Sequence, residues 1–86
     1  MPKYKVLIAR SAEKQLRKLP DKIRDRLARE IVQLGDDPFP FGSKKLSGTE
    51  SSYRIRIGDY RVIYEIEYRE VIVLVLKIGH RKDVYR

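Results

Sequence analysis

The sequence predicts an α+β fold in which a helical hairpin packs on one face of a mainly antiparallel, four-stranded sheet. Three observations lead to it. Residues 4–8 alternate loosely, as a short strand does. Residues 11–19 and 21–34 space their apolar side chains as helices do. The segments from residue 52 onward alternate between polar and apolar residues or are almost wholly apolar, which predicts a meander of three strands.

The chain is short and strongly basic. Its 86 residues predict one domain spanning residues 1–86, and its formal net charge is +8. A small basic domain of this kind often binds nucleic acid or an acidic protein. The chain has no cysteine and one histidine, which excludes disulfides, thiolate metal sites and metal sites built from several histidines. We expect no metal and no cofactor. We find no signal peptide or membrane span and expect a soluble, cytoplasmic protein.

The two helices are expected to form an antiparallel hairpin. Ser11 is the predicted N-cap of the first helix, and Glu13 in its first turn suits the helix dipole. The Leu19-Pro20 pair ends this helix, and Asp21 opens the second. Gly35 occupies the position where a helix-terminating glycine is common. The expected apolar stripes consist of Ala12, Leu16 and Leu19 in the first helix and Ile23, Leu27, Ile31 and Leu34 in the second.

Residues 36–50 contain two prolines and two glycines and predict a long loop. We expect Phe39, Phe41 and Leu46 to pin this loop to the body of the domain. Lys44 and Lys45 within it are flexible positive charges, suited to contacts with backbone phosphate.

Gly58-Asp59 predicts a two-residue hairpin turn with glycine at its first central position. Counting outward from that turn, Arg56 pairs with Arg61 and Arg54 pairs with Ile63. Residues directly opposite in an antiparallel pair share a face. One face therefore carries the apolar residues Tyr53, Ile55, Ile57, Tyr60, Val62 and Tyr64. The other carries Arg54, Arg56 and Arg61, and we call it the arginine face.

Like charges directly opposite one another destabilise a sheet slightly, so the arginine face does not serve folding. Three guanidinium groups on a rigid sheet suit bidentate binding of phosphate. The alternative is that these arginines are merely solvated polar positions, with Glu65 and Glu67 as neutralising partners. Glu65 lies on the same face and is a candidate to hold one arginine in place.

The third strand of the meander, Val71 to Ile78, is almost continuously apolar, as in a strand covered on both faces. Its register is open. A two-residue turn at Tyr68-Arg69 would direct Lys77 into the core, whereas an odd-length loop would bring it beside Arg61. We favour the second, because an unpaired buried lysine is costly. That choice directs Ile72, Leu74 and Leu76 inward.

The tail, residues 79–86, follows this strand and adds further candidates. His80 is the one histidine of the chain and a candidate to exchange a proton, and it is expected at the edge of the arginine face, although a lone histidine is more often structural. Arg81 and Lys82 add positive charge, and Tyr85 is a candidate platform for a stacked base.

Four motifs together resemble the RelE branch of the RelE/ParE toxin superfamily. They are the A-x-x-x-L-x-x-L spacing from Ala12 to Leu19, K-L-x-G at 45–48, Y-R-I-R-I-G-D-Y-R-V-I-Y at 53–64 and G-H-R-x-D-V-Y at 79–85. The resemblance covers nearly the whole chain and implies a RelE-like fold. It also implies a ribosome-dependent mRNA endoribonuclease that is silenced by a small, acidic, RelB-like antitoxin covering its helices or its arginine face.

The resemblance carries functional roles onto Arg54, Arg56, Arg61, Arg81 and Tyr85. It implies cleavage in the ribosomal A site without a metal, by attack of the RNA 2′-hydroxyl on the adjacent phosphate. The three arginines of the arginine face would stabilise the transition state, Arg81 would act near the leaving oxygen, and Tyr85 would stack the base. His80 or Glu65 would take the proton. Lys44, Lys45 and Lys82 are the expected contacts to RNA or ribosome.

One departure from the family pattern keeps other functions open. The pair that is lysine in better-studied members is Arg54 and Arg56 here, and arginine is a poor general base. The alternatives are a gyrase-targeting toxin of the ParE branch and a binding module that docks RNA or an antitoxin without cutting.

Overall fold

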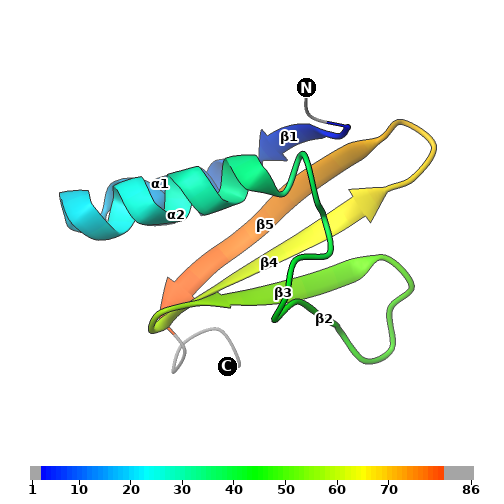
Figure 1. Cartoon of the computed structure of the whole chain (residues 1–86). Coiled ribbons are helices and arrows are strands. Elements are labelled where there is room, and N and C mark those ends of the chain that lie inside the picture. The colour runs from blue at the N-terminus through cyan, green and yellow to red at the C-terminus, as the bar shows by residue number, and fades with distance from the viewer. Residues whose placement is uncertain (1–2, 81–86) are drawn as a thin grey trace.

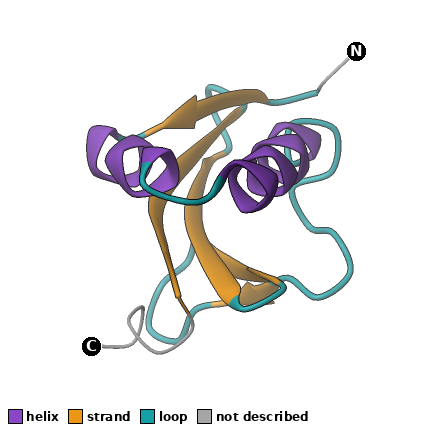
Figure 2. Cartoon of the chain, turned by 90° about the vertical axis from the view of Figure 1, so that its left-hand side faces the viewer, coloured by secondary structure: helices purple, strands orange, loops and turns teal. Residues whose placement is uncertain are grey.

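The computed structural model describes residues 3–80, which form two helices on one face of a five-stranded sheet (Figures 1 and 2). This confirms the predicted α+β class. The elements in chain order are β1 (Lys5–Ile8), α1 (Arg10–Arg17), α2 (Asp21–Gln33), β2 (Lys44–Lys45), β3 (Ser52–Ile57), β4 (Tyr60–Glu67) and β5 (Ile72–His80). Within this part of the chain, neither helix is long and apolar enough to span a bilayer.

The sheet has the strand order β1-β5-β4-β3-β2, with β1 parallel to β5 and all other neighbours antiparallel. The expectation of four strands was wrong, because the loop after α2 contains the short strand β2. Lys44 pairs with Arg54, and Lys45 pairs with Tyr53. A strand of two residues is too short to show alternation, so only its pairing with β3 reveals it.

The β3–β4 hairpin has the register that its turn predicts. Ile57 pairs with Tyr60, and Arg56 pairs with Arg61. Gly58 has a φ of +61°, in the region that a glycine enters without a steric penalty. The tight turn therefore determines which side chains of the hairpin face the helices.

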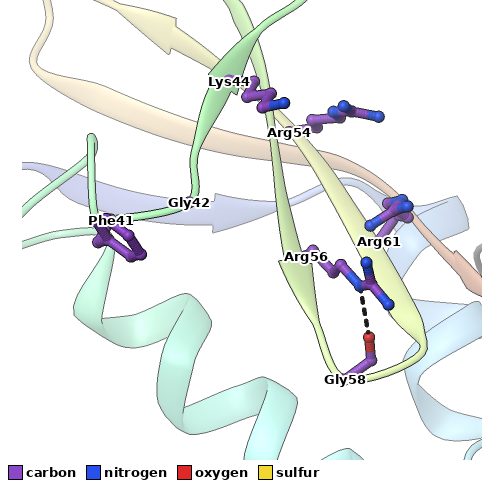
Figure 3. A pocket seen from close by; sticks show the side chains of 7 residues that line it. All are labelled: Phe41, Gly42, Lys44, Arg54, Arg56, Gly58 and Arg61. Atoms are coloured by element: carbon purple, nitrogen blue, oxygen red, sulfur yellow. Dashed lines mark hydrogen bonds between the residues drawn. The ribbon is translucent and has the colours of Figure 1, made fainter.

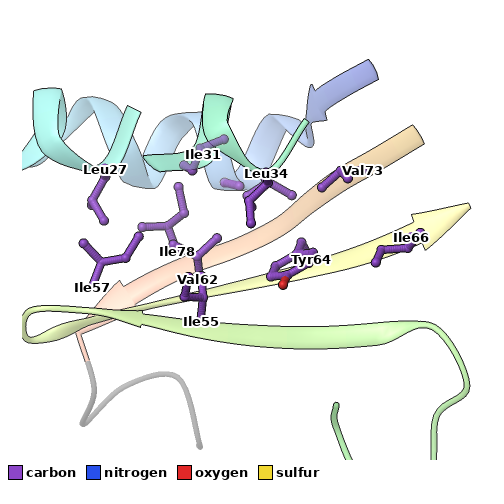
Figure 4. Close-up of a cluster of buried hydrophobic side chains, with 12 residues drawn as sticks. Leu27, Ile31, Leu34, Ile55, Ile57, Val62, Tyr64, Ile66, Val73 and Ile78 are labelled. Carbon is purple, nitrogen blue, oxygen red and sulfur yellow. The ribbon is translucent and has the colours of Figure 1, made fainter. Parts of the chain in front are cut away.

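The core lies between the helices and the near face of the sheet (Figure 4). Leu27 and Ile31 of α2 point toward the sheet, where they meet side chains of β3, β4 and β5. The buried apolar residues are Ala12, Leu27, Ile31, Leu34, Ile55, Ile57, Val62, Tyr64, Ile66, Val73, Val75 and Ile78. The predicted inward set of the hairpin is confirmed, with Tyr53 and Tyr60 packed at the margin of this core.

Strand β5 corrects the predicted register. Four residues, 68–71, connect β4 to β5, and Val73 and Val75 are buried whereas Ile72 and Leu74 are not. The inward placement of Ile72, Leu74 and Leu76 was therefore wrong, as was coverage of this strand on both faces. The side chains of Ile72, Leu74 and Leu76 are only half-buried.

A β-bulge in β5 nevertheless brings Lys77 to the arginine face. The pairing of β4 with β5 shifts between Ile63 and Tyr64, so that Ile63 pairs with Lys77 and Tyr64 pairs with Val75. The extra residue, Leu76, reverses the alternation of the strand. Lys77 thus avoids the core, as predicted, but through a bulge and not through an odd-length loop.

The helix ends differ in detail from the expectation. Helix α1 begins at Arg10, with Ala9 at its N-cap and no side-chain cap, so the assignment of Ser11 as N-cap was wrong. Gly35 does follow α2, but without a positive φ. A Cβ atom there would lie 2.9 Å from the carbonyl oxygen of Tyr4. Only glycine fits at position 35, because the backbone just before β1 approaches it so closely.

Candidate functional site

The arginine face borders an open pocket of about 590 Å³, which we call the arginine pocket (Figure 3). Strands β2, β3 and β4 and the loop before β2 contribute to it. Its lining residues are Phe41, Gly42, Lys44, Arg54, Arg56, Gly58 and Arg61. Four of these seven residues are cationic, so the pocket is suited to an anion.

Strand pairing explains why these cations meet. Arg56 and Arg61 lie directly opposite each other across the hairpin, and Lys44 lies opposite Arg54. Figure 3 shows all four side chains on the same side of the strands. Lys45 pairs with Tyr53 and so shares the opposite face. The structure therefore joins Lys44, but not Lys45, to the three arginines.

The guanidinium groups differ in their burial. Arg56 is exposed, and its Nε donates a hydrogen bond to the carbonyl oxygen of Gly58 at 3.2 Å. Arg54 and Arg61 are half-buried. A guanidinium keeps its charge at any pH a protein tolerates, and its fork of donors matches the oxygens of a phosphate.

The described part of the arginine pocket carries charge but no ordinary proton acceptor. Among its lining residues within 3–80, none is a carboxylate or a histidine. Within the same range, no group of three or more His, Asp or Glu side chains is positioned to hold a metal ion. The pocket can thus bind and stabilise negative charge, and any base must come from outside these lining residues.

Glu65 shares the arginine face but does not line the pocket. Its Oε1 accepts a hydrogen bond from the hydroxyl of Ser51 at 3.4 Å. Lys77 is half-buried on the same face, beside Ile63. Of the predicted proton acceptors, Glu65 is thus the one that strand pairing brings to the side of the arginines.

His80 does not lie where the sequence predicted it. It pairs with Tyr60, and the two rings meet edge to face with centroids 5.7 Å apart. Tyr60 belongs to the side of the sheet that the helices cover, so His80 is on the face opposite Arg61. The bulge at Leu76 is the physical reason, because it reverses the alternation between the start of β5 and its end.

The other tail candidates lie outside the described residues. They are Arg81, Lys82 and Tyr85. Their roles stay predictions.

Phe41 also lines the arginine pocket, and its position was predicted wrongly from the sequence. It was expected to pin the loop, but it is fully exposed at the rim of the arginine pocket. Phe39 does pack against the body, edge to face with Tyr53 at a centroid distance of 5.1 Å. The signal for Phe41 was present in its neighbours, since proline before it and glycine after it are typical of a tight turn that turns a side chain outward.

The loop that carries Phe41 is anchored by a buried tyrosine. The hydroxyl of Tyr64 donates a hydrogen bond to the carbonyl oxygen of Pro38 at 2.7 Å. Burial raises the pKa of Tyr64 to about 12, so this hydroxyl keeps its proton at neutral pH. The start of the loop is thereby joined to the core, and β2 joins its end to β3.

Comparisons with known proteins agree with this architecture. A family model described as the ParE toxin of the type II toxin–antitoxin system parDE matches residues 6–85. Toxin RelG of Mycobacterium tuberculosis is 32% identical over 96% of this chain and 97% of its own length. The mRNA interferase toxin RelE of Escherichia coli is 31% identical over 86% of this chain and 81% of its own.

A solved structure is similar over almost the full length. A chain of the archaeal RelE–RelB complex from Pyrococcus horikoshii superposes with a TM-score of 0.83 at 33% identity. The match covers 95% of this chain and 99% of that one. The matching family model and these relatives all extend over most of the chain. The model carries the ParE name, whereas the relatives carry Rel names.

Proposed function

Because the chain belongs to the RelE branch of the RelE/ParE toxin superfamily, we propose that it is a toxin that cuts mRNA on the ribosome. The observation that carries this proposal is the arginine pocket. Arg54, Arg56 and Arg61 gather with Lys44 on one open face, although like charges opposite each other bring no benefit to folding. An RNA phosphate would relieve that repulsion and occupy the pocket.

In the proposed reaction, the RNA 2′-hydroxyl oxygen attacks the adjacent phosphorus. The O2′–P bond forms and the P–O5′ bond breaks, which yields a 2′,3′-cyclic phosphate and a free 5′-hydroxyl. The proton lost from O2′ goes to a base, and a second proton reaches O5′. Negative charge builds up on the phosphorane oxygens in the transition state, and the guanidinium groups of Arg54, Arg56 and Arg61 would stabilise it.

The base would come from outside the arginine pocket. Glu65 is the candidate that we favour over His80, because it shares the arginine face and His80 does not. Arg81 is proposed near the leaving oxygen. Tyr85 is proposed to stack the base and so orient the sugar for attack. No step of this scheme requires a metal.

The proposed partners are the ribosome with its mRNA and an acidic, RelB-like antitoxin. Solved relatives include RelE–RelB complexes, which supports an antitoxin for this chain. A net charge of +8 is complementary both to RNA and to an acidic protein. The proposed place of action is the cytoplasm, where ribosomes translate.

Primer extension tests the proposal. Purified protein is added to mRNA held on translating ribosomes and, in parallel, to the same mRNA free in solution. We expect a new cut inside the A-site codon that appears only with ribosomes. The absence of a cut from folded protein would contradict the proposal. A gyrase supercoiling assay then tests the activity of the ParE branch, whose name the matching family model bears.

A further inference from the structure

Phe41 is exposed to an unusual degree for a large apolar side chain. Its exposed fraction is 105%, whereas the other exposed large apolar residues within 3–80 range from 36% to 66%. A phenylalanine in this position leaves its whole ring in water and contributes nothing to the core. Folding therefore gives no reason for an aromatic residue at this position.

A hydrogen-bonded turn presents this ring. The backbone N–H of Ser43 donates to the carbonyl oxygen of Pro40 at 2.9 Å, which closes a four-residue turn with Phe41 at its second position. Gly42 follows with a φ of +93°, as the third residue of a type II turn requires. The Tyr64–Pro38 hydrogen bond precedes this turn and the pairing of Lys44 with Arg54 follows it. The ring is thus carried by a segment anchored at both ends.

The turn places Phe41 at the rim of the arginine pocket (Figure 3). Its ring and the cations of Lys44 and Arg54 line the same open volume. Proteins that bind single-stranded nucleic acid combine a positively charged groove with aromatic side chains on which unpaired bases stack. The arginine pocket has both elements.

We propose that Phe41 is a stacking platform for an unpaired base of the RNA whose phosphate occupies the arginine pocket. This inference rests on the proposed function and deepens it, because it assigns a further residue that positions the substrate. The occupant is a nucleobase, since the charges beside the ring are positive and every base has a face that can stack.

Cleavage kinetics of four variants test the role of the ring. Phe41→Ala removes it, Phe41→Leu keeps an apolar side chain without aromaticity, and Phe41→Tyr keeps the ring. From the usual strength of base stacking, we expect kcat/KM for cleavage on ribosomes to fall by about 5- to 150-fold for the first two. Phe41→Tyr should recover most of the rate. Val32→Ala, at an exposed position on α2, should leave it unchanged.

A binding assay tests stacking independently of cleavage. The chain contains no tryptophan, so Phe41→Trp introduces a single fluorophore at the rim of the pocket. Titration with a single-stranded RNA oligonucleotide should quench its fluorescence, because a stacked base lies against the indole. Val32→Trp carries the same fluorophore on α2 and should be quenched much less.

The outcomes separate this proposal from the proposed function. If the wild type does not cleave, the proposed function fails by itself, and the fluorescence titration still decides whether Phe41 stacks on a base. If the wild type cleaves and Phe41→Ala cleaves equally fast, the stacking proposal is overturned. Equal cleavage combined with weaker antitoxin binding would identify Phe41 as part of a protein interface instead.

Discussion

One face of the β3–β4 hairpin packs beneath the helices, whereas its other face surrounds an open pocket with three arginines. Ile57 and Val62 on the first face are 4% and 0% exposed. On the second face, Arg56 and Arg61 lie opposite each other with like charge. The same strands and the same turn build both faces, so the difference comes only from which side chains alternate to which side.

This difference separates the residues that stabilise the domain from those that we assign to its function. Burial of apolar area stabilises the fold, and the helix-covered face supplies it. On the arginine face Arg56 and Arg61 bring like charges opposite each other, and an anion that binds there would add stability. Substitutions on the two faces should therefore have opposite signatures, with stability changing on one and activity on the other.

The largest expected loss of stability follows from Leu27→Ala on the helix-covered face. Leu27 is 1% exposed and packs in the core, so its truncation leaves a cavity. We expect the free energy of unfolding to fall by about 2–5 kcal/mol, measured by urea denaturation. Protein that remains folded should cleave at the wild-type rate. A loss of cleavage greater than the loss of folded protein would show that the helix-covered face also contributes directly to activity.

Arg61→Ala should have the largest effect on activity. Removing one donor that stabilises transition-state charge slows a reaction by about 10²–10³-fold, and we expect that decrease in cleavage on ribosomes. Because Arg61 is half-buried, the free energy of unfolding of the variant is measured in parallel, and the loss of cleavage should greatly exceed any loss of folded protein. Arg29→Ala, on the exposed side of α2, is the matched control and should cleave normally. Equal rates for the two variants would remove Arg61 from the proposed site.

Tyr64→Phe tests the link between the faces, because Tyr64 is buried in the core and anchors the loop that carries Phe41. The variant lacks the hydroxyl that donates a hydrogen bond to the carbonyl oxygen of Pro38 at 2.7 Å in the wild type. We expect a loss of about 1–3 kcal/mol in the free energy of unfolding, together with slower cleavage. Thermal unfolding and primer extension measure the two effects. Unchanged stability would show that this hydrogen bond does not anchor the loop.

The same hydroxyl predicts how stability depends on pH. The pKa of Tyr64 is raised by burial from 10.0 to about 12. Below pH 10 both the folded and the unfolded states keep the proton, and the stabilisation is complete. As pH rises from about 10 to about 12, the unfolded state loses its proton first, so the free energy of unfolding falls. Tyr64→Phe should show a smaller decline over this range in urea titrations.

Tyr68 is the control for that measurement. The pKa of this half-exposed tyrosine is also raised to about 12, chiefly by its hydrogen bond with Tyr53 at 3.1 Å. Because solvent screens it, Tyr68→Phe should change the alkaline decline less than Tyr64→Phe. The reverse order would mean that the surface pair and not the buried hydroxyl governs stability at high pH.

The smallest expected effect is a gain in stability from a substitution on the arginine face, opposite in sign to the loss expected in the core. Arg56→Thr removes one of two like charges that oppose each other and places a good strand former at an exposed position. We expect the free energy of unfolding to rise by roughly 0.2–1 kcal/mol at low salt, while cleavage falls. Added salt should shrink the gain in stability because it screens the repulsion. A loss of stability would show that the arginine face contributes to folding.

The elements that depend on neighbouring residues could be predicted from the sequence. The two helices follow from apolar spacing, and the hairpin register follows from Gly58-Asp59, which also brings Arg54, Arg56 and Arg61 to one face. The inward residues of that hairpin were likewise predictable, since alternation along each strand is local.

The pairing of β5 and the course of the loop before β2 could not be predicted in this way. Apolar residues occupy both alternating sets of β5, so alternation does not choose a register. Pro40 and Gly42 indicate a turn at Phe41, but the place of that turn beside the arginines depends on its ends, which Tyr64 and β3 hold. Both features rest on contacts between segments that are distant in the chain.

The sequence by itself therefore determined the fold class, the β3–β4 hairpin and the gathering of three arginines, because a two-residue turn and a period of two residues are local properties. Only the tertiary structure decided that the bulge at Leu76 brings Lys77 to the arginine face and His80 to the opposite one. It also decided that Lys44 joins the arginines and that Phe41 stands at their rim. The physical reason is that strand pairing and loop anchoring are selected by the packing of the whole domain and not by neighbours along the chain.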